Sequence, residues 1–175
     1  MMERDATHIL PESLRGFLDI TEIDDARLLA SGLFQRKFGS PPPDFGRHLV
    51  ALYRDADGSM HVAGYSHMRR FGEVYLSGGS CSDGATIRRM PAAQREAVQE
   101  AGGIWYLILK YAFERYADCC DVFFGHCGDA RALQVATAAG FVSAGHAHLI
   151  AHWHKPLHEN IRRALVAKVH ALGPF

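Results

Sequence analysis

The sequence has little of what marks disulfide-rich or nucleic-acid-binding proteins. Its 175 residues contain four cysteines, and these show no CxxC spacing, so reduced thiols are expected. Lys plus Arg (19) balances Asp plus Glu (19), and the formal net charge is zero. Because no overall field favours nucleic acid or an anionic membrane, we expect neither as a partner, although a local basic patch stays open.

Long apolar runs are also missing. No uninterrupted apolar segment approaches the roughly 18 residues that indicate a membrane span. Residues 1–17, MMERDATHILPESLRGF, carry acidic residues and a proline where a secretory signal needs a basic start and an apolar run. A cytoplasmic location is therefore predicted. Hydrophobic content of 48% and charged content of 22% predict a single compact domain over residues 1–175.

The first half of the chain reads as a strand, a helix and three further strands. Alternating and helical apolar patterns predict a strand at 14–20 and a helix within 21–38, followed by a proline-rich loop. Residues 47–71 hold two strand-like runs joined by the turn signal DADG, which predicts a hairpin. The next strand, VYLSGGSCS at 74–82, contains a glycine pair that predicts a bulge or a splayed strand end.

The second half alternates helices with strands. Residues 84–101 look like an arginine-rich loop with a short helical piece after Pro91. The remaining predicted elements are a long helix at 102–116, a buried-type strand at 121–126, a helix at 129–140, strands at 141–145 and 146–155, and a terminal helix at 157–173. This order predicts an α/β fold of the α+β type, with a mixed, mostly antiparallel sheet and helices on both faces.

Two motifs carry a family resemblance. The segment DARALQVATAAGF at 129–141 is similar in spacing to NxxAxxLYxxxGF, and QEAGGI at 99–104 is similar to Q/RxxGxG/A. Together with the element order over 14–155, they resemble the GCN5-related N-acetyltransferase (GNAT) superfamily. The resemblance implies direct transfer of an acyl group from acetyl-CoA, or another acyl-CoA, to a small amine or a peptide amine.

The resemblance also implies positions for the cofactor. The open N-terminus of a helix binds a pyrophosphate through unpaired backbone amides and the positive end of its dipole, which suits the glycine-containing loop before residue 104. Asp129 stands where the family has an asparagine that holds the pantetheine arm, and helix N-capping is the alternative interpretation. The implied cofactor-binding residues are Ser80, Cys81 and Ser82, through their backbone, with Gln99, Ala101, Gly102, Gly103, Ile104 and Asp129.

The catalytic residues are less well defined by the sequence. Ala136 occupies the position where the family commonly has a tyrosine that protonates the leaving thiolate. Candidate replacements near the expected cleft are His126, Cys127, Tyr75 and Glu73. His126 is the first choice as acid or base, with a strand-terminal histidine lacking chemistry as the alternative. Glu73 is a carboxylate base or a solvated charge, and a cysteine could form an acyl-enzyme.

Four histidines, His146, His148, His152 and His154, share one parity of the predicted strand 146–155. Imidazoles on alternate residues can converge on a transition metal, but no carboxylate or cysteine lies at an evident ligand spacing. We assign no metal ligand and keep metal binding as a weaker alternative. A second alternative is a catalytically degenerate GNAT-like module that binds a ligand or a partner, and a homodimer also stays open.

Overall fold

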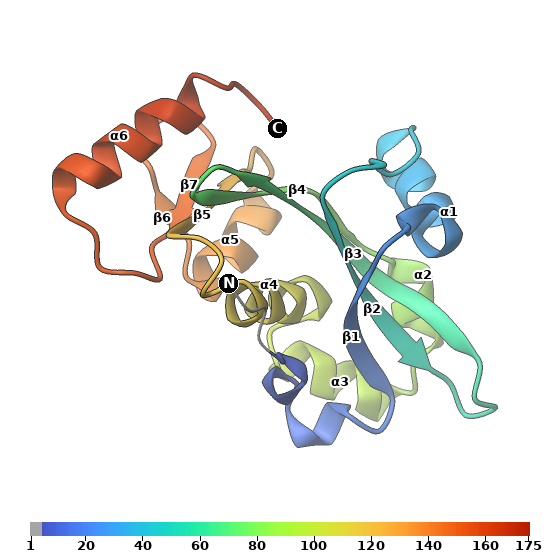
Figure 1. Cartoon of the computed structure of the whole chain (residues 1–175). Helices are drawn as coiled ribbons and strands as arrows, with labels where there is room; N and C mark the ends of the chain where they lie inside the picture. Colours follow the sequence, from blue (N-terminus) through green and yellow to red (C-terminus); the bar gives the residue numbers. More distant parts are fainter. Residues whose placement is uncertain (1–4) are drawn as a thin grey trace.

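The computed structural model describes residues 5–175 as an open sheet with helices packed against it (Figure 1). The first four residues, on which the expected lack of an export signal partly rests, lie outside the described residues. Two 3-10 turns, Thr7–Ile9 and Glu12–Leu14, precede the sheet. The strands are β1 (Leu18–Ile23), β2 (Arg47–Arg54), β3 (Met60–Phe71), β4 (Val74–Ser82), β5 (Val122–His126), β6 (Val142–Ser143) and β7 (Leu149–His152).

The sheet contains one parallel pair. Its seven strands run in the order β1-β2-β3-β4-β5-β7-β6, and every neighbouring pair is antiparallel except β4 and β5. A parallel pair needs a long crossover, and three helices supply it. The helices of the fold are α1 (Ala26–Phe38), α2 (Gly84–Arg89), α3 (Ala92–Glu100), α4 (Ile104–Arg115), α5 (Ala130–Ala139) and α6 (Glu159–His170).

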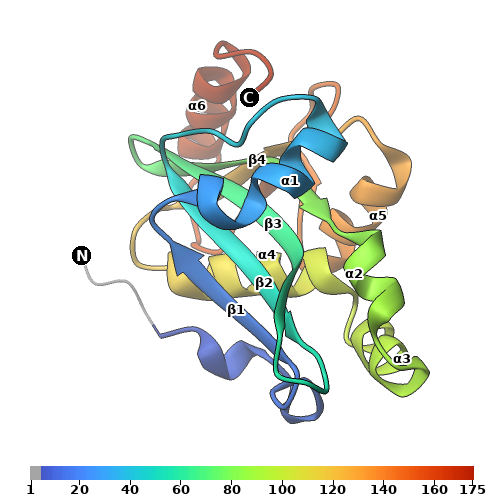
Figure 2. The same cartoon turned by 90° about the vertical axis from the view of Figure 1, so that its right-hand side faces the viewer.

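Helices cover both faces of the sheet. Figure 2 shows α1 in front of β2 and β3, with α4 running behind them. The side of β4 that carries Tyr75 packs into the core formed by α4 and α5. Its neighbours Val74 and Leu76 point the other way and pack against Leu165 and Val169 of α6. The mixed, mostly antiparallel sheet with helices on both faces confirms the fold class expected from the sequence.

Local signals in the sequence explain several element ends. The Asp25 side chain accepts a hydrogen bond from the backbone N–H of Arg27 and so caps α1. The hairpin between β2 and β3 turns at the predicted DADG, where Asp55 accepts a hydrogen bond from the Ser59 N–H at 2.9 Å. At its other end, α5 stops at Gly140, whose φ of 114° ends the helix.

Three sequence predictions need correction. The first strand begins at Leu18, because residues up to Leu14 form 3-10 turns. The arginine-rich stretch expected as a loop is helical, since Asp83 caps α2 through the N–H of Ala85 and α3 starts after Pro91. The strand expected at 146–155 is shortened to β7, because His148 adopts a left-handed backbone with φ of 63°.

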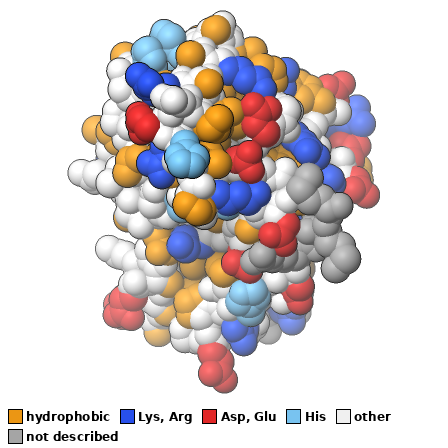
Figure 3. Space-filling view, turned by 60° about the vertical axis from the view of Figure 1, so that its left-hand side comes forward, with side chains coloured by type: hydrophobic (Ala, Val, Ile, Leu, Met, Phe, Trp, Pro, Cys, Tyr) orange, Lys and Arg blue, Asp and Glu red, His pale blue; other side chains and the backbone are white. Residues whose placement is uncertain are grey.

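The surface is mixed in charge on the face drawn in Figure 3, where acidic, basic and hydrophobic side chains are interspersed. The terminal helix α6 buries Leu165 and Val169, whereas Ile161 of the same helix and Leu172, just after it, stay exposed. Within residues 5–175, every helix is too short or too polar to cross a membrane.

Candidate functional site

The candidate site begins where β4 and β5 separate. The two strands pair only as far as Ser77 and Gly125, and beyond that point β4 continues to Ser82 beside β3 alone. The register between β3 and β4 also shifts between Tyr65 and His67, opposite the glycine pair. The bulge predicted from VYLSGGSCS is therefore present, and the separation leaves backbone of β4 facing open space.

A cavity of about 250 Å³ opens at this separation. It joins strands, loops and helices that are far apart in the sequence, and Trp105 of α4 and Phe38 of α1 close its sides. The remaining lining residues are Ser77, Gly78, Gly79, Ser80, Gly125, His126, Cys127, Gly128, Asp129, Ala132, Ala136, Phe141 and Ile150. Four residues predicted from the sequence, Ser80, His126, Cys127 and Asp129, thus meet in one cavity.

The cavity is graded from a polar mouth to an apolar floor. His126 and Asp129 are exposed, whereas Ala136, Phe141 and Ile150 are buried, with 0%, 2% and 6% of their surfaces exposed. Among the described residues, none of those lining the cavity is a lysine, an arginine or a glutamate. Among the described lining residues, the ionisable side chains therefore lie at the mouth of the cavity.

Two side chains at the mouth could move protons. The exposed His126 ring lies 5.7 Å from the His148 ring, measured between centroids. The Cys127 thiol donates to the Asp129 carbonyl with 3.5 Å between sulfur and oxygen. Burial raises the pKa of the Cys127 thiol, so its proton stays on sulfur at neutral pH. Because the thiolate is the nucleophilic form, this argues against an acyl-enzyme at Cys127.

For Asp129 the sequence left two alternatives, a helix N-cap and a cofactor contact, and its position is compatible with both. Its Oδ1 accepts a hydrogen bond from the Ala132 N–H at 2.7 Å, which makes it the N-cap of α5. The same residue lines the cavity. Capping therefore holds the carboxylate at the mouth of the cavity.

The glycine loop before α4 adjoins the cavity through Trp105, in the first turn of that helix. Gly102 and Gly103 both have positive φ, 99° and 91°, and no side chain caps the helix at Gly103. Ile104 is buried, and its Cγ2 lies 2.5 Å from the position that a Cβ on Gly64 would take. Its side chain therefore packs under β3. None of the five residues predicted in this loop, Gln99, Ala101, Gly102, Gly103 and Ile104, lines the cavity.

Glu73 and Tyr75 are not brought to the cavity. Glu73 lies in the β3–β4 turn and forms an ion pair with Lys168 at 2.8 Å, which holds the pKa of its carboxyl below the usual range. Tyr75 is 3% exposed and stacks on Tyr116 at 4.8 Å, on the face covered by α4. Both precede the point where β4 leaves β5, so neither belongs to the candidate site.

Two further cofactor candidates, Cys81 and Ser82, lie in the last part of β4, beyond the cavity lining. Cys81 packs against the cluster formed by α1, and burial raises the pKa of its thiol to about 11. It is therefore not a nucleophile at neutral pH. The backbone of these two residues continues the β4 wall, with Ser82 paired opposite Gly64.

Sequence reasoning missed several cavity residues. Trp105 follows the glycine loop directly, and that adjacency was a usable signal. Phe38 gave no local signal, because only the fold brings the end of α1 to the cavity. Phe175 does not line the cavity but lies beside it, where the fold brings the C-terminal segment. The Phe175 carbonyl oxygen lies 3.2 Å from the position of a Cβ on Gly78, and its ring centroid lies 6.2 Å from that of His126.

The four histidines at 146–154 do not converge. His146 stacks on His170 at 3.7 Å, His148 lies beside His126, and His152 stacks on Phe113 at 4.0 Å. The Nε2 of His154 lies 3.1 Å and 3.0 Å from the carbonyl oxygens of Ala117 and Cys120. Within residues 5–175, no three His, Cys, Asp or Glu side chains are arranged to hold a metal ion.

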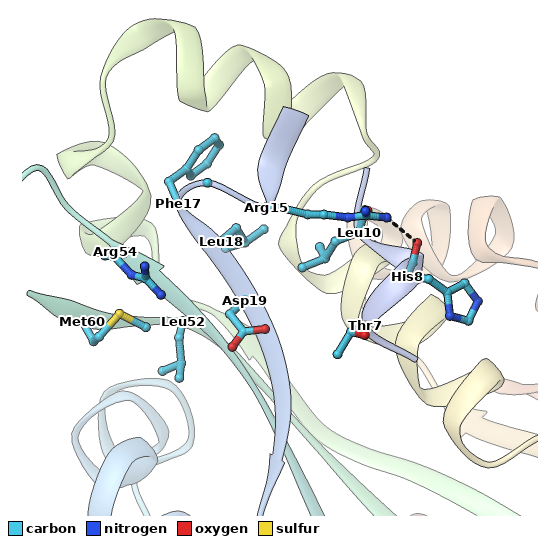
Figure 4. A pocket seen from close by; sticks show the side chains of 11 residues that line it. Thr7, His8, Leu10, Arg15, Phe17, Leu18, Asp19, Leu52, Arg54 and Met60 are labelled. Carbon is cyan, nitrogen blue, oxygen red and sulfur yellow. Dashed lines mark hydrogen bonds between the residues drawn. The ribbon is translucent and has the colours of Figure 1, made fainter. Parts of the chain in front are cut away.

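A second cavity, of about 410 Å³, lies between the 3-10 turns and β1 and β2 (Figure 4). Its Arg15 side chain donates to the carbonyl oxygens of Leu10 and His8, at 2.8 Å and 3.1 Å. These bonds hold the arginine against its own segment. None of the residues predicted for function lines this second cavity.

Comparison with known proteins gives no independent indication of function. No protein-family model matches the chain, and no curated protein matches it either.

Proposed function

We propose that this protein is an N-acyltransferase of the GNAT type, which uses acetyl-CoA or another acyl-CoA. The observation that carries the proposal is the cavity where β4 leaves β5, because it adjoins an uncapped helix N-terminus through Trp105. The spacing from Asp129 to Phe141 and the order of elements support the same family. Each feature alone is common, but the position of the helix N-terminus beside the cavity favours a cofactor with a phosphate end and an extended arm.

The residues present fit such a cofactor. The first turn of α4 offers backbone N–H groups and the positive end of a helix dipole, which favour a pyrophosphate. The β4 wall offers peptide groups that do not pair with β5, and Asp129 can accept a hydrogen bond from an amide of the arm. When bound, acyl-CoA supplies the activated thioester.

The chain's own contribution to transfer is positioning and proton movement. The attacking amine must be neutral, and His126 at the cavity mouth is the side chain that can accept its proton. Ala136 cannot donate a proton to the departing thiolate. Because a free thiol has a pKa near about 8.5, the thiolate can leave without a positioned acid, and we expect slow turnover.

Calorimetric titration of the full chain with acetyl-CoA tests the proposal. The variant Ala132→Trp places a large ring on a residue that lines the cavity, and Ala138→Trp makes the same change at an exposed position of the same helix. Binding by the wild type and by Ala138→Trp, with loss in Ala132→Trp, is expected. No binding by the wild type at millimolar ligand would overturn the proposal.

A non-catalytic module that binds CoA or a partner is the second candidate. It is favoured by Ala136 and by the protonated Cys127, since neither supplies the chemistry of a fast enzyme. Assaying acetylation over a broad panel of amines separates the two functions. Product formation that depends on His126 supports the enzyme, whereas CoA binding without any product supports the module.

A further inference from the structure

A hollow of about 490 Å³, called the α6 hollow below, lies between helix α6, strand β6 and the loop after β6, and Trp153 also lines it. Figure 1 shows α6 beside β6 and β7, on the far side of the molecule from α1. Among residues 5–175, none lines both the α6 hollow and the cavity at the β4–β5 separation. The hollow is therefore a separate place for a ligand.

Arg162 brings to this hollow a charge for which the described residues supply no anion. Its guanidinium lies over the Trp153 ring, with 5.1 Å between Cζ and the ring centroid. Its Nε is buried and has no hydrogen-bond partner within residues 5–175. A buried guanidinium donor normally has an acceptor, because leaving it without one is costly. The donors of Arg162 therefore favour an anion from outside the chain.

The other charges of the hollow leave the lining positive. Arg163 also lines it and donates one hydrogen bond, to the Asn160 side-chain oxygen at 2.6 Å. Glu159 is the one acidic residue of the described lining, so that, with His146 counted as neutral, two arginines face one carboxylate. A guanidinium held against an indole keeps its plane fixed, and its donors match the two oxygens of a carboxylate.

The rest of the hollow offers apolar surface that a ligand can reach. Val142 is 53% exposed, and Ala144, Trp153 and Val166 are partly exposed where they pack against the core under α6. Covering such surface favours an apolar group, because both sides lose contact with water. A bare, strongly hydrated anion would leave this surface unused. Apolar surface beside two arginines therefore suits an anion with an apolar body.

From this arrangement we propose that the α6 hollow is a second ligand site, which binds a small carboxylate with an apolar body. The carboxylate lies on the two arginines, and the body lies against the apolar residues of β6, its loop and α6. The site does not depend on the proposed acyl-CoA function, because the two cavities share no lining residue within residues 5–175.

The two tryptophans of the chain allow a direct test, because Trp153 lines the α6 hollow and Trp105 lines the other cavity. The full chain is titrated with phenylacetate while both indole N–H signals are followed by NMR. Phenylacetate should shift the Trp153 signal and the amides of 142–146 and 159–167, with a dissociation constant on the order of 1 mM for a ligand of this size. The Trp105 signal should stay in place.

Three further probes separate charge from apolar contact. Phenylacetamide lacks the charge, acetate lacks the apolar body, and inorganic phosphate tests whether any oxyanion is sufficient. Each should bind at least about tenfold more weakly than phenylacetate, because hydrogen bonds to a charged group and burial of an apolar ring are each worth that factor. Equal binding of phenylacetamide or phosphate would overturn the proposal, as would an unchanged Trp153 signal at tens of millimolar phenylacetate.

A matched pair of variants assigns the binding to Arg162. Arg162→Met removes the charge and keeps an apolar stem over Trp153, whereas Arg131→Met makes the same change of charge at an exposed position of α5 outside the hollow. Phenylacetate affinity should fall at least about tenfold in Arg162→Met and stay within about twofold in Arg131→Met.

Arg162→Lys is the smaller change, because it keeps the charge and lacks the planar fork, and it should bind phenylacetate severalfold more weakly. Thermal unfolding checks the fold of each variant. Full affinity in folded Arg162→Met or Arg162→Lys, or an equal loss in Arg131→Met, overturns the proposal.

Discussion

The two walls of the cavity differ in what they present to a ligand. The β4 wall, Ser77–Ser80, is mostly backbone: it contains two glycines, and the Ser80 hydroxyl is hydrogen-bonded to the Ser66 hydroxyl at 2.7 Å. The opposite wall, after β5, carries the titratable side chains His126, Cys127 and Asp129. Substitutions in the first wall should therefore act through shape and stability, and those in the second through chemistry.

The largest expected effect comes from Gly79 in the backbone wall. Its φ is 56°, and a Cβ there would lie 3.1 Å and 3.2 Å from two ring atoms of Phe34. Gly79→Ala should cost about 2–4 kcal/mol in the free energy of unfolding, from the left-handed backbone and the overpacked ring together. Denaturant unfolding measures the change.

Gly58→Ala is the matched control for this prediction. Gly58 also has a positive φ, 88°, but nothing lies within 4 Å of its Cβ position. Its loss should be limited to the backbone cost of about 1 kcal/mol. Equal losses in the two variants would show that contact with Phe34 does not constrain the β4 wall.

His126 tests the wall that carries side chains. His126→Gln should lower kcat by about a hundredfold, because a positioned base typically contributes at least that much. Its stability should stay within about 0.5 kcal/mol of the wild type, since the side chain is exposed. Steady-state kinetics with the best amine of a panel measures the loss, and the neighbouring His148→Gln is the control. Unchanged kcat in His126→Gln would leave His126 a strand-terminal histidine without chemistry.

Substitution of Asp129 should have a smaller effect on stability, and it separates capping of α5 from contact with the cofactor. Asp129→Ala removes the cap of α5 and should cost about 1 kcal/mol, whereas Asp129→Asn keeps a capping oxygen and should be nearly neutral. If the carboxylate also holds the cofactor arm, Asp129→Ala lowers the affinity for CoA as well. Full CoA affinity in Asp129→Ala, measured by calorimetry, would reduce this residue to a helix cap.

The smallest expected effect is a pH dependence of stability that arises from His67, on the strand next to the β4 wall. His67 pairs opposite Gly78 and is 6% exposed, and its Nε2–H donates a hydrogen bond to the Phe45 carbonyl oxygen at 2.6 Å. Burial lowers the pKa of His67 below its ordinary value of 6.5. The unfolded chain then takes up this proton at higher pH than the folded chain, so stability should fall as the pH drops below 6.5 and stay flat above it.

Unfolding midpoints between pH 5 and pH 8 measure this dependence, with His67→Gln compared with the wild type. The variant should show a shallower decline on the acid side, because the buried His48 and the half-buried His152, whose pKa values desolvation also lowers, keep part of it. Identical pH profiles for the two proteins would contradict the assignment to His67.

The sequence predicted the features that depend on a few neighbouring residues, such as helix ends and the bulge in β4. Asp129 and Gly140 bracket α5, and the glycine pair of VYLSGGSCS announced the bulge, because capping and left-handed backbone depend on a few neighbouring residues. The helix α2 was missed although Asp83 before GAT was an available capping signal. These features belong to single segments, and each can be read without knowing the rest of the fold.

The candidate site was only partly predictable, because it depends on where two strands separate. The sequence does not indicate that β4 and β5 separate after Ser77. The position of this separation determines that His126 lines the cavity, whereas Glu73 and Tyr75 do not. The histidine parity failed for a similar reason, since the left-handed backbone at His148 shortened the strand. Contacts between distant segments, such as Phe175 against Gly78, are set by tertiary packing.

The most direct test of the central claim is to map CoA binding by amide chemical shifts in the full chain. The account predicts that the largest shifts fall in three separate segments, 77–82, 102–105 and 126–132, each of which contributes residues to the cavity at the β4–β5 separation. The contrasting cavity of Figure 4, with Arg15 and Asp19 in its lining, should be unaffected. Shifts confined to that second cavity, or no shifts at millimolar CoA, would contradict the account.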